Sequence, residues 1–128
     1  MSSIELAENY INSLKEGDIN SFFSFLSDTV IWNQPGSNSL SGKYFGKESV
    51  EKLLSEFMRR SQGTFSITDI FSIKENHGLI KIELKFYAKN DFHSIDMLGT
   101  DILRISKGKI QEVWLYSNDQ ESEDQFWA

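Results

Sequence analysis

Apolar residues at the start of the chain recur at the spacing of amphipathic helices. Between positions 4 and 14 they return every three or four residues, directly after Ser2, which begins a capping-box sequence. Gly17 is a natural helix stop, and Asp18 can cap a second, short helix that extends to residue 26. The pattern therefore predicts two helices before the first strand.

The period changes after this point. Residues 29–33 are rich in β-branched and aromatic side chains and predict a strand that ends at the Pro35-Gly36 turn. The segment Ser37–Gly46 is rich in serine and glycine and predicts a loop. Lys47–Arg60 carries apolar residues at positions i, i+3, i+4 and i+7, and Gly63 follows it, so it predicts a third helix.

The second half of the chain alternates between apolar and polar residues, which predicts four long strands. They cover residues 65–73, 80–88, 95–105 and 110–117. Asn76-His77-Gly78 and Lys107-Gly108 predict hairpin turns between them. The strand at residues 65–73 is expected to bury one face, made of Phe65, Ile67, Phe71 and Ile73. The tail, Ser117–Ala128, carries four acids and is expected to be a solvated end from which Phe126 and Trp127 dock back.

This order of elements predicts an α+β fold in a single domain of residues 1–128. Segregated helices and hairpin-linked strands indicate an antiparallel or mixed sheet. Strands of this length coil strongly, and Gly99, in the middle of an apolar face, can mark a bend. We therefore expect a cone-shaped, curved sheet with three N-terminal helices on its concave face, enclosing a pocket.

Composition removes several classes of function. The 13 basic and 19 acidic residues give a net charge of −6, which argues against a nucleic-acid surface. The chain has no cysteine and two histidines, which disfavours metal sites, and we expect no cofactor. Neither a membrane-length apolar run nor a signal peptide is present in the sequence, so we expect a cytoplasmic protein with no membrane partner.

Four segments, in this order, resemble the nuclear-transport-factor-2-like superfamily, and more narrowly its SnoaL-like and ketosteroid-isomerase-like branch. They are Tyr10–Asp18 (YINSLKEGD), Val30–Gly36 (VIWNQPG), Ser41–Gly46 (SGKYFG) and Asp101–Trp114 (DILRISKGKIQEVW). The resemblance covers nearly the whole chain and implies the cone-shaped fold. It does not fix a function, because this fold hosts cyclases, isomerases, hydrolases, dehydratases and non-catalytic binding proteins.

The resemblance also implies roles for individual residues. Ketosteroid isomerases hold an enolate oxygen with a tyrosine and a protonated aspartate, and use a second aspartate as the base. Tyr10 and Asp101 match the oxygen-binding pair, whereas Gln34 occupies the position of the base. Glutamine cannot take a proton from carbon, so the base is missing there. His93 and Asp69 are the remaining candidates for it, although a one-residue bulge would turn Asp69 to solvent.

Alternation places Asp101 on the apolar face of its strand. A carboxylate there must be paired, hydrogen-bonded or protonated, and it could equally be a structural residue bonded to Tyr10 or to backbone. Strand alternation turns Trp32 to the same side as Gln34, as a pocket wall or as ordinary core. The expected ligand-binding residues are Trp32, Gln34, Phe86, Met97 and Leu103.

The opposite face of the sheet also carries large apolar side chains. Alternation turns four of them away from the helices: Leu98, Ile102, Trp114 and Tyr116. A patch of this kind is unusual on a monomer, and it predicts a homodimer through the sheet face.

Two functions remain open from the sequence. The first is a domain that binds a small apolar molecule in a pocket with a Tyr10–Asp101 polar pair. The alternative is an isomerase or polyketide-cyclase-like enzyme that stabilises the enolate of a small carbonyl compound. Its base would be His93, Asp69 or a water molecule held by Gln34.

Overall fold

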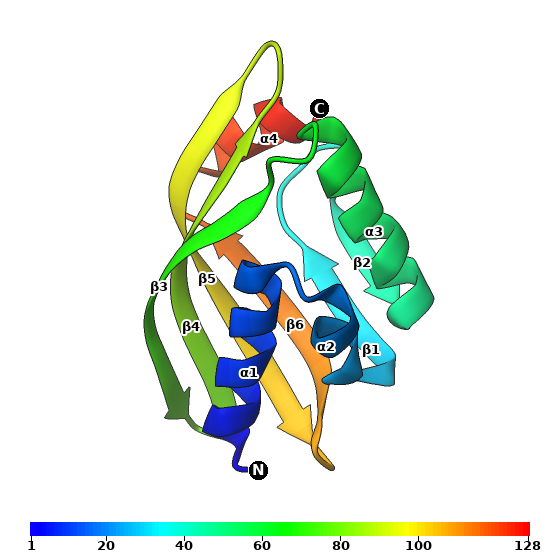
Figure 1. Ribbon diagram of the computed structural model, residues 1–128, viewed down its shortest axis with the longest axis vertical. Helices are drawn as coiled ribbons and strands as arrows, with labels where there is room; N and C mark the ends of the chain where they lie inside the picture. Colours follow the sequence, from blue (N-terminus) through cyan, green and yellow to red (C-terminus); the bar gives the residue numbers. More distant parts are fainter.

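The structure, a computed structural model, describes residues 1–128 (Figure 1). Four helices and six strands make up the chain. In chain order they are α1 (Ser3–Glu16), α2 (Ile19–Ser24), β1 (Leu26–Gln34), β2 (Gly42–Phe45), α3 (Lys47–Arg60), β3 (Ser66–Asn76), β4 (Leu79–Lys89), β5 (Ser94–Ser106), β6 (Lys109–Ser117) and α4 (Gln120–Trp127). None of the helices is long and apolar enough to cross a membrane.

The six strands form one mixed sheet in the order β2-β1-β6-β5-β4-β3. All neighbours are antiparallel except β1 and β6, which are parallel. The predicted hairpins at His77-Gly78 and Lys107-Gly108 are confirmed, with both residues of each loop at positive φ. Such turns match the right-handed twist of the flanking strands. The α+β fold with a curved mixed sheet is therefore as predicted.

The helices cover the concave side of the sheet, where the core lies (Figure 1). Helix α1 packs on β3 and β4, and α3 packs on β1 and β2. The ends of α1 follow the sequence signals: the Ser2 hydroxyl accepts the backbone N–H of Glu5, and Gly17 closes the helix at a φ of 75°.

Gly99 lies on the concave face, in the middle of β5. A Cβ atom at this position would lie 3.1 Å from the ring of Phe86 and 3.2 Å from the carbonyl oxygen of Tyr116. The ring of Phe86 therefore packs directly against the backbone of Gly99. A larger residue at position 99 would displace this ring.

Three expectations are wrong. The segment Ser37–Gly46 is not all loop, because it contains β2, a four-residue edge strand too short to show an alternating pattern. The tail is not a solvated end, because it forms the helix α4. Asp119 caps this helix, and the acidic residues in its first turn interact favourably with the helix dipole. Phe126 and Trp127 do dock back, at 3% and 1% exposure. Phe71 is exposed, because two register shifts in β3 rotate it out of the core.

Candidate functional site

A cavity of about 60 Å³ lies between the concave face of the sheet and the helices α1, α3 and α4. This volume holds a few water molecules or the end of a small ligand. Its walls are mostly apolar and include five aromatic side chains: Trp32, Phe57, Phe65, Phe86 and Trp127. Its polar side chains are Gln34, Asp101, Ser117 and Glu123. No lysine, arginine or histidine lines it.

Asp101 reaches the cavity from the middle of β5. Its side chain shares the concave face with Leu103 because residues two apart on a strand point the same way. It is 9% exposed, and no hydrogen bond reaches its carboxyl group. Burial, and then the negative charge of Glu123, raise the pKa of Asp101 from 3.8 to about 7. Near neutral pH this carboxyl group therefore exists in both protonation states.

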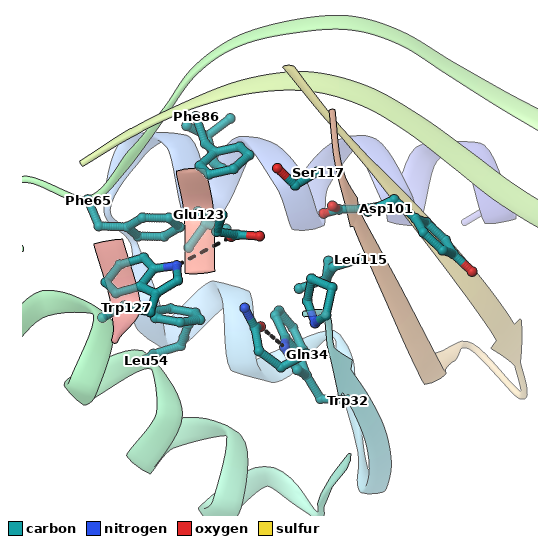
Figure 2. A pocket seen from close by; sticks show the side chains of 15 residues that line it. Trp32, Gln34, Leu54, Phe65, Phe86, Asp101, Leu115, Ser117, Glu123 and Trp127 are labelled. Atoms are coloured by element: carbon teal, nitrogen blue, oxygen red, sulfur yellow. Dashed lines mark hydrogen bonds between the residues drawn. The ribbon is translucent and has the colours of Figure 1, made fainter. Parts of the chain in front are cut away.

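Glu123 reaches the same cavity from α4, and its carboxyl group points into the space that Asp101 faces (Figure 2). It is 6% exposed. The indole N–H of Trp127 donates to it at 3.3 Å, and the side-chain amide of Gln120 donates at 3.1 Å. Burial raises the pKa of Glu123 even though these two bonds act in the opposite direction. Two carboxyl groups with raised pKa values thus share one apolar space.

The side chains of Trp32 and Gln34 meet at the cavity wall. The indole N–H of Trp32 donates a 3.1 Å hydrogen bond to the Gln34 side-chain oxygen (Figure 2). The amide nitrogen of Gln34 has no partner, and the side chain is 6% exposed. Gln34 therefore offers a hydrogen-bond donor to whatever occupies the cavity.

Helix α4, which carries Glu123, is anchored to the loop between β1 and β2. The Asp124 carboxylate accepts hydrogen bonds from the backbone and hydroxyl of Ser37, both at 3.2 Å, and from the Asn38 amide at 2.8 Å. Gly36 has no room for a Cβ atom, which would overlap with the side chains of Asp124 and Gln120. At its far end, the Arg60 guanidinium donates to the carbonyl of Trp127. These contacts hold Glu123 over the cavity.

No family model and no curated protein sequence matches the chain. Solved structures do match it. A Xanthomonas campestris protein of unknown function with a cystatin-like fold is 37% identical, over 100% of this chain and 99% of that chain, with a TM-score of 0.96. Proteins named NTF2-like, from Burkholderia species, have the same fold. The chain belongs to the same family as the Xanthomonas campestris protein and shares the fold of the NTF2-like structures.

Two further structures show which names occur on this NTF2-like fold. TerC, co-crystallised with polyporic acid, is 12% identical over 98% of each chain, with a TM-score of 0.82. A Mesorhizobium loti protein, named provisionally as a SnoaL-like polyketide cyclase, is 17% identical over 91% of this chain and 99% of that chain, with a TM-score of 0.72. At these identities the likeness establishes the fold alone.

The cavity is lined by some of the residues that were expected from the sequence. Asp101, Trp32, Gln34 and Phe86 all line it. Glu123 was not expected. The sequence did contain a signal for it: in a helix that docks Trp127, the residue four positions earlier points toward the same side.

Met97 and Leu103 were expected to line the cavity and do not. Leu103 is fully buried in the core. Met97 lies beside Ser117, whose hydroxyl contacts its sulfur at 2.8 Å. Both residues lie on the concave face of β5, as alternation requires, but the cavity occupies only part of that face.

Tyr10 also lies away from the cavity wall. It is fully buried, and its ring stacks on Phe22 with 4.7 Å between centroids. Its hydroxyl group has no hydrogen-bond partner. Burial, and then the charge of Asp101, raise the pKa of Tyr10 well above its usual value. The two residues are thus electrostatically coupled without a hydrogen bond between them.

The two other base candidates are exposed. His93 lies in the turn before β5, where its backbone N–H donates to the Asn90 side chain. His93 lies two residues before the buried Ile95, but β5 begins only at Ser94, so strand alternation does not apply to it. Asp69 follows a register shift in β3 and faces solvent. Neither side chain lines the cavity.

The chemistry available in the cavity follows from these side chains. Asp101 and Glu123 can accept hydrogen bonds, hold a proton or donate one when protonated, and Gln34 can donate. No group of three or more metal-ligating side chains is present anywhere in the chain. The site can thus recognise a polar group on an otherwise apolar molecule.

Proposed function

We propose that this NTF2-like domain binds a small, largely apolar molecule in the cavity and holds its polar group at Asp101 and Glu123. The observation that supports this most directly is the carboxyl group of Asp101, which is 9% exposed and has no hydrogen-bond partner. Buried polar groups in folded proteins are nearly always hydrogen-bonded, so a carboxyl group that faces a cavity without a protein partner supports the binding of a polar group there.

A purely structural role accounts poorly for this carboxyl group. A buried acid costs stability unless other groups compensate it, and here the charged group that acts on the pKa of Asp101 is a second acid, Glu123. An apolar residue would fill the same position at a lower cost. TerC, which has the same fold, was crystallised with a small molecule, polyporic acid, which is consistent with a binding role for such domains.

A proton-transfer enzyme is the second candidate, and Glu123 is the observation that favours it. Gln34 cannot act as a base, but Glu123 brings a carboxyl group to the same cavity from α4. An ionised carboxylate could take a proton from the carbon beside a carbonyl group, while a protonated Asp101 donates a hydrogen bond to the carbonyl oxygen. The Mesorhizobium loti protein of the same fold carries the provisional name polyketide cyclase, which denotes an enzyme of this class.

The positions of the three tryptophans provide a direct test of binding. Trp32 and Trp127 line the cavity, whereas Trp114 lies on a different face and does not. Native mass spectrometry of freshly purified protein should reveal a retained small molecule. Its addition to stripped protein should shift the indole N–H resonances of Trp32 and Trp127 in a ¹H–¹⁵N NMR spectrum and leave that of Trp114 in place. Equal shifts of all three, or none, would contradict binding in this cavity.

Two further parts of the proposal concern assembly and location. The exposed face of the sheet supports a homodimer, because Leu98 and Tyr116 are 49% and 58% exposed there. Ile102 pairs across the strands with Trp114 on the same face, and both are half-buried. The absence of cysteine supports a cytoplasmic location.

A further inference from the structure

The charges at the cavity are all of one sign. Asp101 and Glu123 face it, and no basic side chain lines it. The Arg60 guanidinium lies near the end of α4, but it pairs with Glu56 at 3.1 Å and donates to the Trp127 carbonyl. Inside the cavity, therefore, no positive charge compensates the two carboxyl groups.

The walls around these acids are aromatic. Trp32, Phe86 and Trp127 line the same cavity, and Figure 2 shows all three around the space that the two carboxyl groups face. The faces of aromatic rings attract cations, and the attraction is stronger where water is excluded. The acids and the aromatic rings thus both favour a positively charged ligand.

We propose that the ligand is a small organic amine, bound as its ammonium ion between Asp101 and Glu123, with its apolar part against Trp32, Phe86 and Trp127. This assignment rests on the proposed binding function and names the class of molecule that the cavity takes. An ammonium group donates hydrogen bonds to both carboxylates, and charge-assisted bonds of this kind are the strong ones.

Other ligand classes fit the same groups less well. A carboxylate or phosphate would add a third negative charge. A neutral carbonyl compound could accept a hydrogen bond from a protonated Asp101, but Glu123 would gain no partner from it. The amide of Gln34 remains available for an oxygen elsewhere on the amine.

Binding of a cation should be coupled to loss of protons from the site. The groups that face Asp101 are Glu123 from α4 and, from α1, the neutral phenol of Tyr10. Asp124, the charged neighbour of Glu123, is already held by Ser37 and Asn38. A bound ammonium ion therefore favours the ionised form of both carboxyl groups, so affinity should rise between pH 6 and pH 8.

The test compares three probes of matched size: propylammonium, 1-propanol and propionate. Their binding is followed by the indole resonances of Trp32 and Trp127, with Trp114 as the internal reference. We expect propylammonium to bind about tenfold or more tightly than 1-propanol at pH 8, and propionate to bind most weakly. The preference for the amine should shrink at pH 6.

Two variants locate the effect. Asp101→Asn and Glu123→Gln keep the shape of each side chain and should each reduce the preference for propylammonium at least severalfold. Glu121→Gln is the matched control, because Glu121 lies on the same helix, changes the net charge equally and is exposed. This variant should bind like the unmodified protein.

The outcomes separate this assignment from the proposed function on which it rests. Equal affinity for propylammonium and 1-propanol, or an amine preference that survives both cavity variants, overturns the amine assignment and leaves binding in the cavity intact. Failure of every probe to shift Trp32 and Trp127 overturns the amine assignment. If native mass spectrometry also finds no retained molecule, the proposed function fails with it.

Discussion

The indole nitrogen of Trp32 donates a 3.1 Å hydrogen bond to the side-chain oxygen of Gln34, two residues further along β1. The bond orients the amide so that its nitrogen is free for the cavity. In the isomerases that the chain resembles, this position carries the catalytic base. Here it holds a neutral donor, and the carboxyl groups of the site come instead from β5 and α4.

Gln34→Glu should make the stability of the protein more sensitive to pH. The new side chain can keep the bond from Trp32, but it adds a third acid beside Asp101 and Glu123. Burial and like charges raise its pKa, so the folded state is penalised mainly where this acid must ionise. We expect urea unfolding to give a loss of roughly 1–3 kcal/mol at pH 8 and a smaller loss at pH 5. Gln34→Met, which adds no charge, serves as the control, and a loss independent of pH in Gln34→Glu would contradict the prediction.

Asp101 should reduce stability as the pH rises. Its pKa is about 7 in the folded protein against an ordinary 3.8, so the folded state binds a proton that the unfolded state has already lost. Stability is therefore fully present below about pH 4 and declines until the pH passes about 7. A difference of about three pH units corresponds to at most ~4 kcal/mol.

The comparison of wild type with Asp101→Asn isolates this effect. The difference in unfolding free energy between the two proteins should grow in favour of the variant from pH 4 to pH 8. Asp96→Asn is the control, because Asp96 lies on the same strand, is exposed and pairs with Lys85 at 3.2 Å. Parallel stability curves for wild type and Asp101→Asn would show that Asp101 titrates normally.

The sequence was most informative where a strand is long and one of its faces is buried. Alternation over β4 correctly predicted that Ile82, Leu84 and Phe86 are buried, and alternation over β5 turned Asp101 inward. These predictions succeed because a shift of one residue would expose a whole row of apolar side chains.

Short elements carried too little signal. Helix α4 has eight residues, and its acids resemble a solvated tail until Phe126 and Trp127 find the core. The second carboxyl group of the site was missed together with that helix. Tyr10 was expected in the pocket, but it is buried away from the cavity, where Phe22 stacks on it from α2. The position of a buried side chain relative to the cavity depends on how the helices pack together, and the apolar pattern of one helix does not specify this packing.

Asp124→Ala should loosen α4 while leaving the sheet intact. The substitution leaves the backbone N–H of Ser37 and the amide of Asn38 without their acceptor. Hydrogen bonds to charged groups contribute about 1.5–3 kcal/mol each when buried and less when exposed, so we expect a loss of roughly 1–2 kcal/mol. Amide hydrogen exchange should accelerate in α4 and stay unchanged in β4. Gln125→Ala, at an exposed position of the same helix, should do neither. Uniform acceleration across the chain would contradict a local role.

The exposed face of the sheet should form a dimer interface centred on Trp114. Sedimentation of the wild type should give about twice the chain mass of 14.8 kDa. Trp114 pairs with Ile102 across β5 and β6, and Leu98 and Tyr116 extend the same apolar face. Trp114→Glu would bury an unpaired charge against its own copy in a two-fold interface, at a cost of several kcal/mol, and should shift the protein to monomer.

Phe92→Glu is the matched control for this substitution. Phe92 is 86% exposed and lies in the turn between β4 and β5, outside the predicted interface, yet the change from an aromatic residue to an acid is similar. It should leave the dimer intact. If both variants dissociate together, general charge repulsion and not the sheet face governs association. If the wild type is monomeric at high concentration, a different partner must cover Leu98, Trp114 and Tyr116, because apolar faces of this kind seldom remain in contact with water.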